Sequence, residues 1–414
     1  MSNLKTIGQK SRLASYEMAR CFTNKKNSAL KFMAENLKKA ERFILENNNK
    51  DIEMARRKGM SGAILDRLKL DKKRIKAMSD GLLSIAALPD PVGEIETMIK
   101  RPNGLYIGKK RVPLGVIGII YEARPNVTVD ASALCLKSGN AVILRGGSEA
   151  INSNRALVKI LKEGLKESDI PSEVIQLITD TKREKVKEMI KMREYIDVLI
   201  PRGGASLIKM VAENSLVPVI ETGVGNCHIY VDDEVDLEMA EKIVINAKTS
   251  RPAVCNAAET LLVAEKVASL FLPKLLSEFE KMGVEIRGCS KVKKIFPVCK
   301  DAIEEDWYTE YLDYIISVKV VKDIDMAIEH INKYGTKHSE TIVTSSYQKA
   351  QKFLEEVDAA AVYVNASTRF TDGFEFGLGA EIGISTQKLH ARGPMGLKEL
   401  TTYKYIIYGN GQIR

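Results

Sequence analysis

Apolar residues recur three and four positions apart in the first part of the chain, and in short continuous runs further on. The first spacing is typical of amphipathic helices and predicts them over residues 3–48, 50–65 and 71–86. Two prolines in "LPDPVG" (88–93) predict the end of this helical region. The alternating stretch that follows is centred on Asn103-Gly104, a pair that favours a tight hairpin.

The continuous apolar runs predict strands buried in a parallel sheet. They alternate with helical segments and glycine-containing turns: "VIGIIYEA", "AVILRGG", "VIQLIT", "IDVLIPRGG", "PVIET" and "CHIYVD". This alternation indicates a doubly wound α/β domain. A second α/β pattern starts at "AETLLVAE" and runs to about residue 364. The C-terminal "ELTTYKYIIYG" alternates aromatic and β-branched residues, which is typical of an exposed edge strand that often pairs with another element.

Composition narrows the classes of function. A chain of 414 residues predicts two or three domains. The net charge of +9 comes from 63 basic and 54 acidic residues that lie side by side on helical faces, so it favours anionic substrates over nucleic acid. The six cysteines lack CxxC spacing and the four histidines lack HExxH, so we expect neither disulfides nor a metal site. With no apolar signal core and no run long enough for a membrane span, we expect a cytoplasmic protein that binds no membrane.

Two glycine-rich turns follow buried strands, "ILRGGSEA" (143–150) and "IPRGGASLI" (200–208). A strand, glycines and a helix N-terminus is an arrangement that brings backbone N–H groups to a phosphate. Neither turn is GxGxxG, so each is either a phosphate-binding loop or a tight βα turn. Arg145 and Arg202 either face a phosphate there or are solvated.

Cys255, in "SRPAVCNAAETLLV", lies between a predicted helix and a predicted strand. Most cysteines are small buried side chains, and Cys135 on an apolar helix face fits that interpretation. Arg251 lies four residues before Cys255, and a guanidinium favours the nucleophilic thiolate. The residues alone leave both interpretations of Cys255 open.

Three further polar residues have two interpretations each. Glu221 ends a predicted strand and is either a general base or a turn residue. Asn126 stands beside a proline and is either a turn residue or an oxyanion donor. His338, at the start of a predicted strand, fits a structural residue better than a catalyst.

In order along the chain, these motifs resemble the γ-glutamyl phosphate reductases of the aldehyde dehydrogenase superfamily. The resemblance extends from residue 88 to 414, and the N-terminal helices also fit it. "YEARPN" and "KYGTKHSETIVT" separate this branch from ordinary aldehyde dehydrogenases. The resemblance implies reduction of γ-glutamyl phosphate with NADPH to glutamate-5-semialdehyde, phosphate and NADP, the second step of proline biosynthesis. An NAD(P)-dependent semialdehyde dehydrogenase, and a catalytically dead scaffold or nucleic-acid binder, are the alternatives.

The resemblance also assigns roles to residues. Cys255 matches the catalytic cysteine, which forms a thioester, with Asn126 as an oxyanion donor and Glu221 as a base or a shuttle for the thiol proton. Glu310 matches the carboxylate that holds the nicotinamide ribose. The other cofactor-binding matches are Arg145, Ser148, Glu149, Gly203, Gly204 and Ser206. Arg145 replaces a lysine and favours the 2′-phosphate of NADP. Arg251, Gly377 and Gly379 are expected at the substrate and its phosphate.

Finally, the resemblance implies an aldehyde dehydrogenase-like division of the chain. We expect an NADP-binding domain (1–100, 122–232 and about 362–383), a catalytic domain (233–361) and a small β oligomerisation flap (101–121 and 384–414). Pairing of flap edge strands between subunits predicts a homodimer or a dimer of dimers. The glutamate 5-kinase that makes the unstable acyl phosphate is expected to be a separate chain that contacts this one transiently.

Overall fold

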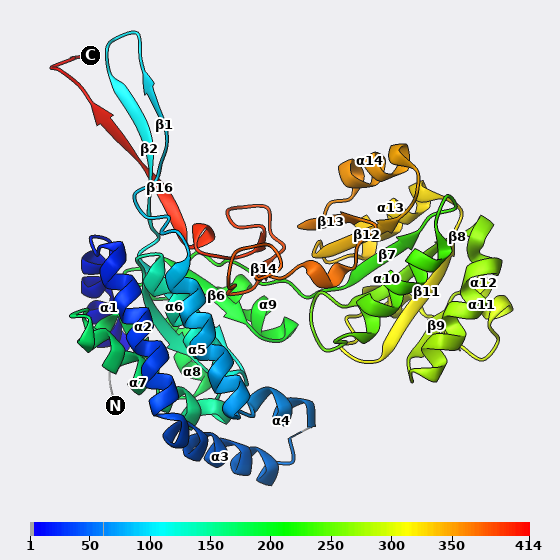
Figure 1. Ribbon diagram of the computed structural model, residues 1–414, viewed down its shortest axis with the longest axis horizontal. Helices are drawn as coiled ribbons and strands as arrows, with labels where there is room; N and C mark the ends of the chain where they lie inside the picture. The colour runs from blue at the N-terminus through cyan, green and yellow to red at the C-terminus, as the bar shows by residue number, and fades with distance from the viewer. Residues whose placement is uncertain (1–3, 61) are drawn as a thin grey trace. The chain divides into compact units, whose positions relative to one another are not determined.

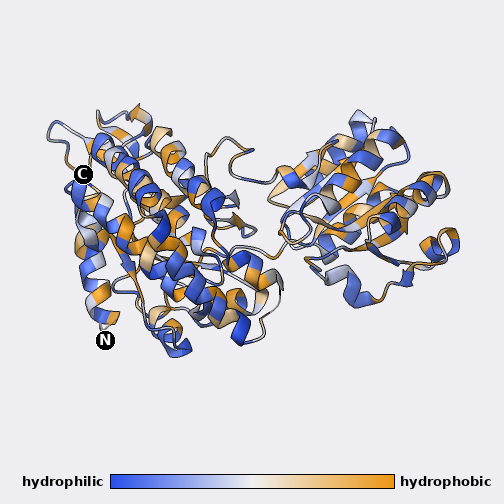
Figure 2. Ribbon diagram, turned by 60° about the horizontal axis from the view of Figure 1, so that its bottom comes forward, coloured by the Kyte–Doolittle hydropathy of each residue, from blue (hydrophilic) through white to orange (hydrophobic). Residues whose placement is uncertain are grey.

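The computed structural model describes residues 4–60 and 62–414, which form two compact units. The first unit comprises the chain up to Glu221 together with Gly377–Gly383 and Met395–Arg414. The second unit comprises Thr222–Phe376 and Ile384–Pro394. Helices of both units alternate polar and apolar stretches, as amphipathic elements do (Figure 2). In the described residues, no helix is both long and apolar enough to cross a membrane.

The predicted helical region is helical, but its divisions differ from the prediction. The helices are α1 (Leu4–Met18), α2 (Thr23–Lys39), α3 (Glu41–Arg57), α4 (Gly62–Leu68) and α5 (Lys72–Ala87). The predicted break after residue 48 is wrong, because α3 continues through "ENNNK". The buried Asn48 amide donates to the Leu68 carbonyl (2.9 Å) and Ser153 Oγ (3.0 Å). Tertiary hydrogen bonds therefore hold a polar residue that favours turns inside a helix.

A four-stranded parallel sheet forms the centre of the first unit, in the order β5-β4-β3-β6. Its strands are β3 (Val116–Tyr121), β4 (Ala141–Arg145), β5 (Ile175–Leu177) and β6 (Val198–Arg202). The helices that follow along the chain are α6 (Pro125–Lys137), α7 (Ile151–Glu167), α8 (Arg183–Met189) and α9 (Ala205–Asn214). β3 and β4 are buried along their whole length, as the continuous apolar runs predict. The predicted strand "PVIET" is wrong, because Val219 and Thr222 make only isolated bridges.

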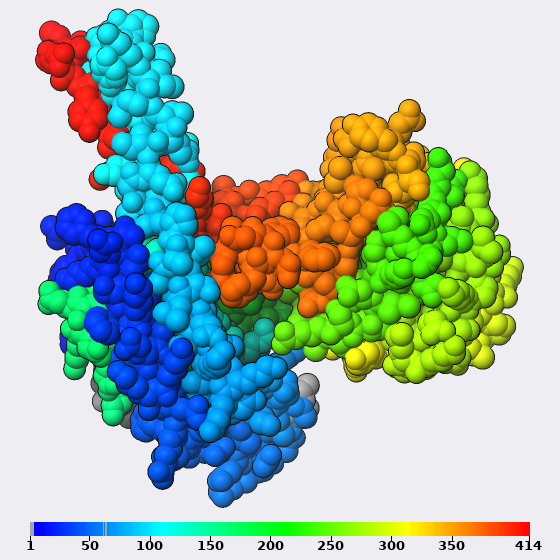
Figure 3. Space-filling view, in the orientation of Figure 1, coloured from blue at the N-terminus to red at the C-terminus, as the bar shows by residue number. Residues whose placement is uncertain are grey.

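Three antiparallel strands in the order β1-β2-β16 form a flap that projects from the helices of the first unit (Figures 1 and 3). They are β1 (Ile95–Lys100), β2 (Tyr106–Pro113) and β16 (Thr401–Tyr408). The predicted hairpin is confirmed, and Gly104 takes a φ of +89° at its turn. β16 pairs with β2 over eight residues and leaves its other edge unpaired among the described strands.

The second unit is built on a seven-stranded parallel sheet in the order β10-β9-β11-β8-β7-β12-β13. The strands are β7 (Cys227–Val231), β8 (Ala258–Ala264), β9 (Glu285–Gly288), β10 (Lys300–Asp301), β11 (Ile315–Val321), β12 (Ser339–Val343) and β13 (Ala361–Val364). The helices are α10 (Leu237–Thr249), α11 (Glu265–Lys281), α12 (Ser290–Ile295), α13 (Ile324–Tyr334) and α14 (Tyr347–Glu356). Short strands β14 (Ile384–Ser385) and β15 (Gly393–Pro394) pair with each other.

The expected mixed α/β class with parallel sheets is therefore confirmed, together with a small β flap. Several strands lie elsewhere than in the expected segments. β3 belongs to the four-stranded sheet rather than the flap, whereas β1 belongs to the flap. β7 and β13 belong to the seven-stranded sheet of the second unit, and β14 and β15 also lie in that unit rather than in the flap. The roles assigned to the three segments stay predictions.

Candidate active site

Cys255 lies in the turn between α10 and β8, as the sequence predicts. Asp236 caps α10 at its start by accepting hydrogen bonds from the N–H groups of Glu238 and Met239, and Pro252 prevents the helix from continuing. β8 is buried at every position, so the turn ends against the core. Cys255 is half-buried and none of the six cysteines, all of them described, is in a disulfide. The turn therefore presents a thiol on a fixed support.

Gly225 lies against this turn, and it is not among the site residues predicted from the sequence. A Cβ on Gly225 would lie 1.5 Å from the Cys255 carbonyl oxygen, so only glycine fits. The Cys227 thiol donates to the same carbonyl (3.2 Å), and burial raises the pKa of this thiol well above its usual value. Cys227 is therefore a neutral donor that orients the Cys255 peptide. The motif "TGVGN" carried the signal, because paired glycines often mark a close backbone approach.

Asn256 anchors the other side of the turn. Its amide donates to the Thr371 carbonyl (2.9 Å), and its own carbonyl accepts from Thr368 Oγ1 (2.7 Å). Asn256 is 5% exposed, so these bonds are protected from water. Cys255 is thus held through its carbonyl on one side and through the next residue on the other.

Glu310 is connected to the support of Cys255. Its Oε1 accepts a hydrogen bond from the Gly225 N–H (2.7 Å), so the carboxylate lies beside the glycine that touches the Cys255 carbonyl. The resemblance predicts Glu310 and Cys255 for one active site, and in the second unit both lie against Gly225.

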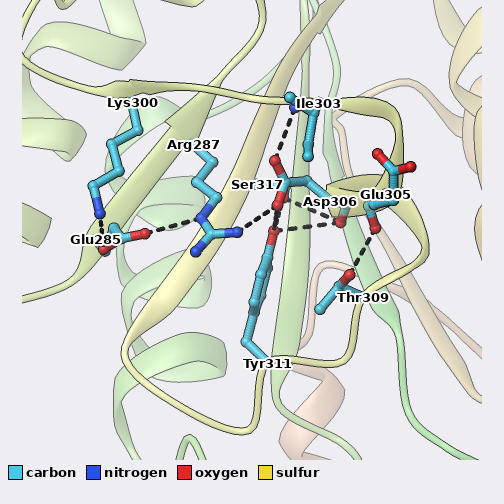
Figure 4. A network of polar contacts seen from close by, with 9 residues as sticks. All are labelled: Glu285, Arg287, Lys300, Ile303, Glu305, Asp306, Thr309, Tyr311 and Ser317. Carbon is cyan, nitrogen blue, oxygen red and sulfur yellow. Dashed lines mark hydrogen bonds and ion pairs between the residues drawn. The ribbon is translucent and has the colours of Figure 1, made fainter.

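A network of polar side chains holds the segment that carries Glu310 (Figure 4). Asp306 accepts from Arg287 (2.6 Å), Tyr311 (2.9 Å) and the Ile303 N–H (2.8 Å). The Tyr311 hydroxyl also lies 2.7 Å from Ser317 Oγ. These bonds, with the Arg287 guanidinium, hold the pKa of the Asp306 carboxyl below its usual value although burial opposes the shift. Since Tyr311 is the neighbour of Glu310, the network fixes the position of that carboxylate.

A buried ion pair also contacts the segment that follows Glu310. Lys248 Nζ in α10 lies 2.6 Å from Glu259 Oε2 in β8, and both side chains are 0% exposed. Glu259 Oε1 also accepts the Leu312 N–H (3.1 Å). Burial raises the pKa of Glu259 to about 7 although Lys248 opposes the shift. No sequence pattern predicts this pair, because charged side chains are usually solvated.

His338 is buried in the second unit, and its structural interpretation stays a prediction. Its Nδ1 lies 2.8 Å from Ser339 Oγ and 3.7 Å from the Cys227 sulfur. The Ser339 hydroxyl continues the chain of contacts to Thr371 Oγ1 (2.6 Å). These contacts link β12 to the support of Cys255.

In the first unit, the two glycines of the turn after β4 lie close to side chains of the same unit. A Cβ on Gly146 would lie 2.2 Å from Asn154 Nδ2, and one on Gly147 would lie 2.0 Å from Glu149 Oε1. Ser148 and Glu149 form the following single helical turn, Ser148–Ala150. The terminal nitrogens of Arg145 donate to the Gly146 carbonyl (3.0 Å) and the Thr181 carbonyl (2.6 Å), so this guanidinium also fixes the loop. The buried Arg145 Nε has no hydrogen-bond partner in the described structure, and its role toward a 2′-phosphate stays a prediction.

The turn after β6 has an acceptor already in place. Gly203 and Gly204 precede α9, and Ser206 lies in the first turn of that helix. The Gly204 N–H donates to the Glu122 carboxylate (3.1 Å), while no atom lies within 4 Å of a Cβ built on Gly204. The turn therefore directs this backbone N–H at a carboxylate of the same unit, and the role of the turn toward a pyrophosphate stays a prediction.

Asn126, Glu221 and the two late glycines also lie in the first unit. The Asn126 amide donates to Asp130 (3.0 Å), whose pKa burial raises to about 6, against that bond and the Arg202 charge. Glu221 is exposed and is the last residue of its segment of the unit. Gly377 and Gly379 adopt positive φ values of 74° and 70°, so both glycines are required by backbone conformation. The catalytic and substrate roles of these four residues stay predictions.

Comparison with known proteins assigns the chain to a family. The model of the aldehyde dehydrogenase family matches residues 24–293. A γ-glutamyl phosphate reductase of Clostridium botulinum (strain Eklund 17B / Type B) is 64% identical over 414 residues, with all of both chains covered. One from Caldicellulosiruptor bescii is 63% identical over 418 residues, again with both chains covered in full. The crystal structure of the γ-glutamyl phosphate reductase of Thermotoga maritima superimposes with a TM-score of 0.97 at 54% identity and full coverage of both chains.

Proposed function

We propose that this chain, which belongs to the aldehyde dehydrogenase family, reduces γ-glutamyl 5-phosphate with NADPH to glutamate-5-semialdehyde and phosphate. This is the second step of proline biosynthesis from glutamate. The observation that carries the proposal is a half-buried thiol at Cys255, on a turn fixed by Gly225, in a chain whose full-length relatives bear the name of this reductase.

Cys255 performs the covalent step. Its thiolate attacks the acyl carbon of the substrate, the bond from carbon to the phosphate oxygen breaks, and phosphate leaves with the electron pair, so that a thioester remains. The Cys255 N–H and the Asn126 amide stabilise the negative charge that develops on the acyl oxygen. Glu221 accepts the thiol proton. Water attack at this stage would waste the intermediate, so Glu221 is assigned to proton transfer and not to hydrolysis.

The residues of the two glycine-rich turns fit a dinucleotide. Gly203, Gly204 and Ser206 bind the pyrophosphate, while Arg145, Ser148 and Glu149 bind the adenosine side, and Glu310 holds the nicotinamide ribose. When bound, NADPH supplies the hydride that converts the thioester to the aldehyde and releases the thiolate. Family membership supports a nicotinamide cofactor; the preference for NADPH over NADH rests on Arg145 and needs its own measurement. Arg251 binds the phosphate, and Gly377 and Gly379 border the substrate.

The flap is the proposed oligomerisation surface. Tyr405 and Ile407 on β16 are 67% and 59% exposed, and an apolar edge strand of this kind is stable when it pairs with a second copy. A homodimer or a dimer of dimers follows. The unstable acyl phosphate gives a reason for transient contact with a separate glutamate 5-kinase in the cytoplasm.

The reverse reaction tests the proposal. Purified protein is mixed with glutamate-5-semialdehyde and NADP, with and without phosphate, and NADPH is followed by absorbance. We expect NADPH to appear only with phosphate, because phosphate must release the acyl group from Cys255. Equal rates without phosphate would instead show the alternative, a hydrolysing semialdehyde dehydrogenase. Repeating the assay with NAD measures the cofactor preference.

A substitution tests the nucleophile separately. Cys255→Ala removes the only group that forms the thioester, so turnover should fall below about a percent of wild type. NADPH binding, followed by its fluorescence, should be nearly unchanged. Cys135→Ala, at a buried cysteine in the first unit, is the control and should keep its activity. Substantial turnover by Cys255→Ala would speak against covalent catalysis.

A further inference from the structure

We propose that Arg369, together with Arg251, binds the phosphoryl group of the substrate and is a catalytic residue of this enzyme. The proposal rests on the proposed function, because it requires an acyl phosphate substrate. Neither the sequence pattern nor the family resemblance had singled out Arg369, which lies in the unpatterned stretch "ASTRFTDGF".

Arg369 bridges the two ends of the cysteine turn. Its Nε donates to Oγ of Ser250 (3.1 Å), which precedes Arg251. Its Nη1 donates to Oδ1 of Asn256, which follows Cys255. The guanidinium therefore spans the segment that contains Cys255. Its remaining terminal nitrogen, Nη2, has no hydrogen-bond partner among the described residues.

The segment that carries Arg369 is held in place from several sides. Arg369 belongs to the single helical turn Thr368–Phe370, whose N-cap Ser367 accepts from the Arg369 N–H. Thr368 Oγ1 donates to the Asn256 carbonyl (2.7 Å), and Thr371 Oγ1 lies 2.7 Å from the Tyr363 hydroxyl. A half-buried arginine on such a support loses little further conformational freedom when it binds a ligand.

The charge around the thiol is unbalanced. Burial lowers the pKa of Arg369, and the like charge of Arg251 lowers it next, whereas the Cys255 thiol and Asp372 oppose the shift. Among the described residues, neither Arg251 nor Arg369 forms an ion pair with a carboxylate. Arg251 is exposed and makes no hydrogen bond to a described residue. Asp372 is an acidic neighbour of Arg369 but forms no ion pair with it, so the two guanidinium groups still favour the arrival of an anion.

A phosphoryl group fits this pair chemically. Guanidinium groups bind phosphate oxygens through parallel N–H donors, and the interaction strengthens as the leaving phosphate gains charge while its bond to carbon breaks. Phosphate is also the attacking group in the reverse reaction, where the same two arginines would hold it beside the thioester.

Steady-state kinetics of the phosphate-dependent reverse reaction test the proposal. Arg369→Gln should raise the KM for phosphate at least about tenfold while the KM for glutamate-5-semialdehyde stays within about twofold. Arg369→Lys keeps the positive charge but not the two parallel N–H donors of the guanidinium, so it should give an intermediate KM for phosphate. Arg251→Gln, which leaves the bonds of the turn intact, should also raise it. Guanidinium ion added to Arg369→Ala should restore part of the activity.

Arg392→Gln is the matched control, because Arg392 is a half-buried arginine of the second unit that pairs with Asp358 (2.7 Å) and should leave the phosphate KM unchanged. The proposal is overturned if the Arg369 variants lower kcat without changing the phosphate KM, which would show that Arg369 only supports the turn. An unchanged phosphate KM in Arg369→Lys and Arg251→Gln would overturn it even if Arg369→Gln does not fold. Wild-type turnover without phosphate would overturn the proposed function and this inference together, so the two failures are distinguishable.

Discussion

Removal of the Lys248 charge should destabilise the second unit, and the loss should grow with pH. Lys248 and Glu259 are both 0% exposed and 2.6 Å apart, so solvent does not screen their interaction. Lys248→Met leaves the Glu259 carboxyl buried without its cation, and breaking a buried pair in this way costs about 3–5 kcal/mol. We expect this full loss in the free energy of unfolding at about pH 8.

The pH dependence follows from the pKa of Glu259, which burial raises from 4.5 to about 7. A carboxyl whose pKa is higher in the folded state than in the unfolded state stabilises the protein less and less as pH rises from the unfolded-state pKa through the folded-state pKa. In the wild type this decline ends near pH 7, where Glu259 ionises against Lys248. Without Lys248 the folded pKa lies higher, so the decline continues. The loss in the free energy of unfolding caused by Lys248→Met should therefore be about 1–2 kcal/mol at pH 5–6 and grow above pH 7.

The single tryptophan makes the measurement specific to this unit. Trp307 is 6% exposed and lies in the second unit, so its fluorescence during urea unfolding follows that unit alone. Lys242→Met is the matched control, because Lys242 pairs with Glu238 on the same helix at 2.7 Å but with both side chains exposed, and it should change stability by less than about 0.5 kcal/mol. Lys248→Met/Glu259→Gln keeps an acceptor for the Leu312 N–H and should remove the extra pH dependence. Lys248→Met with wild-type stability at pH 8, or with a deficit that shrinks as pH rises, would refute the reasoning.

Three further substitutions test the support of the site and the flap. Gly225→Ala puts a Cβ 1.5 Å from the Cys255 carbonyl oxygen, so kcat in the phosphate-dependent assay should fall at least about 100-fold while NADPH binding is retained. A near-normal kcat would mean that the turn tolerates displacement. Tyr311→Phe removes the hydroxyl contacts to Asp306 (2.9 Å) and Ser317 (2.7 Å), which should destabilise the second unit by about 1–3 kcal/mol in the Trp307 assay. It should also raise the KM for NADPH. An unchanged KM would show that the network does not position Glu310. Tyr405→Glu with Ile407→Glu places charge on one face of β16 and should lower the molar mass measured by light scattering, whereas an unchanged mass would place the subunit contact elsewhere.

The sequence predicted those features that depend on neighbours along the chain. The Asn103-Gly104 turn, the buried runs of β3 and β4, and the position of Cys255 between a helix and a strand all follow from local pattern. Features that depend on distant partners did not follow. Asn48 continues a helix because of the Leu68 carbonyl and Ser153, which lie 20 and 105 residues away. The same limit hid the buried Lys248–Glu259 pair, whose residues resemble solvated charges until the fold brings β8 and α10 together.

Most of what the sequence missed serves to fix one peptide. The Cys255 carbonyl lies against Gly225 and accepts from Cys227, and Asn256 is held by Thr368 and Thr371. These contacts act on the Cys255 carbonyl and on Asn256, so they restrain the backbone that carries the Cys255 side chain. A nucleophile attacks an acyl carbon efficiently only from a rigidly held backbone. An N–H group that stabilises the charge on the acyl oxygen has the same requirement. In the proposed mechanism, the residues around Cys255 contribute to catalysis mainly by preventing motion, which is why a substitution at Gly225 should lower kcat more than it changes the KM of either substrate.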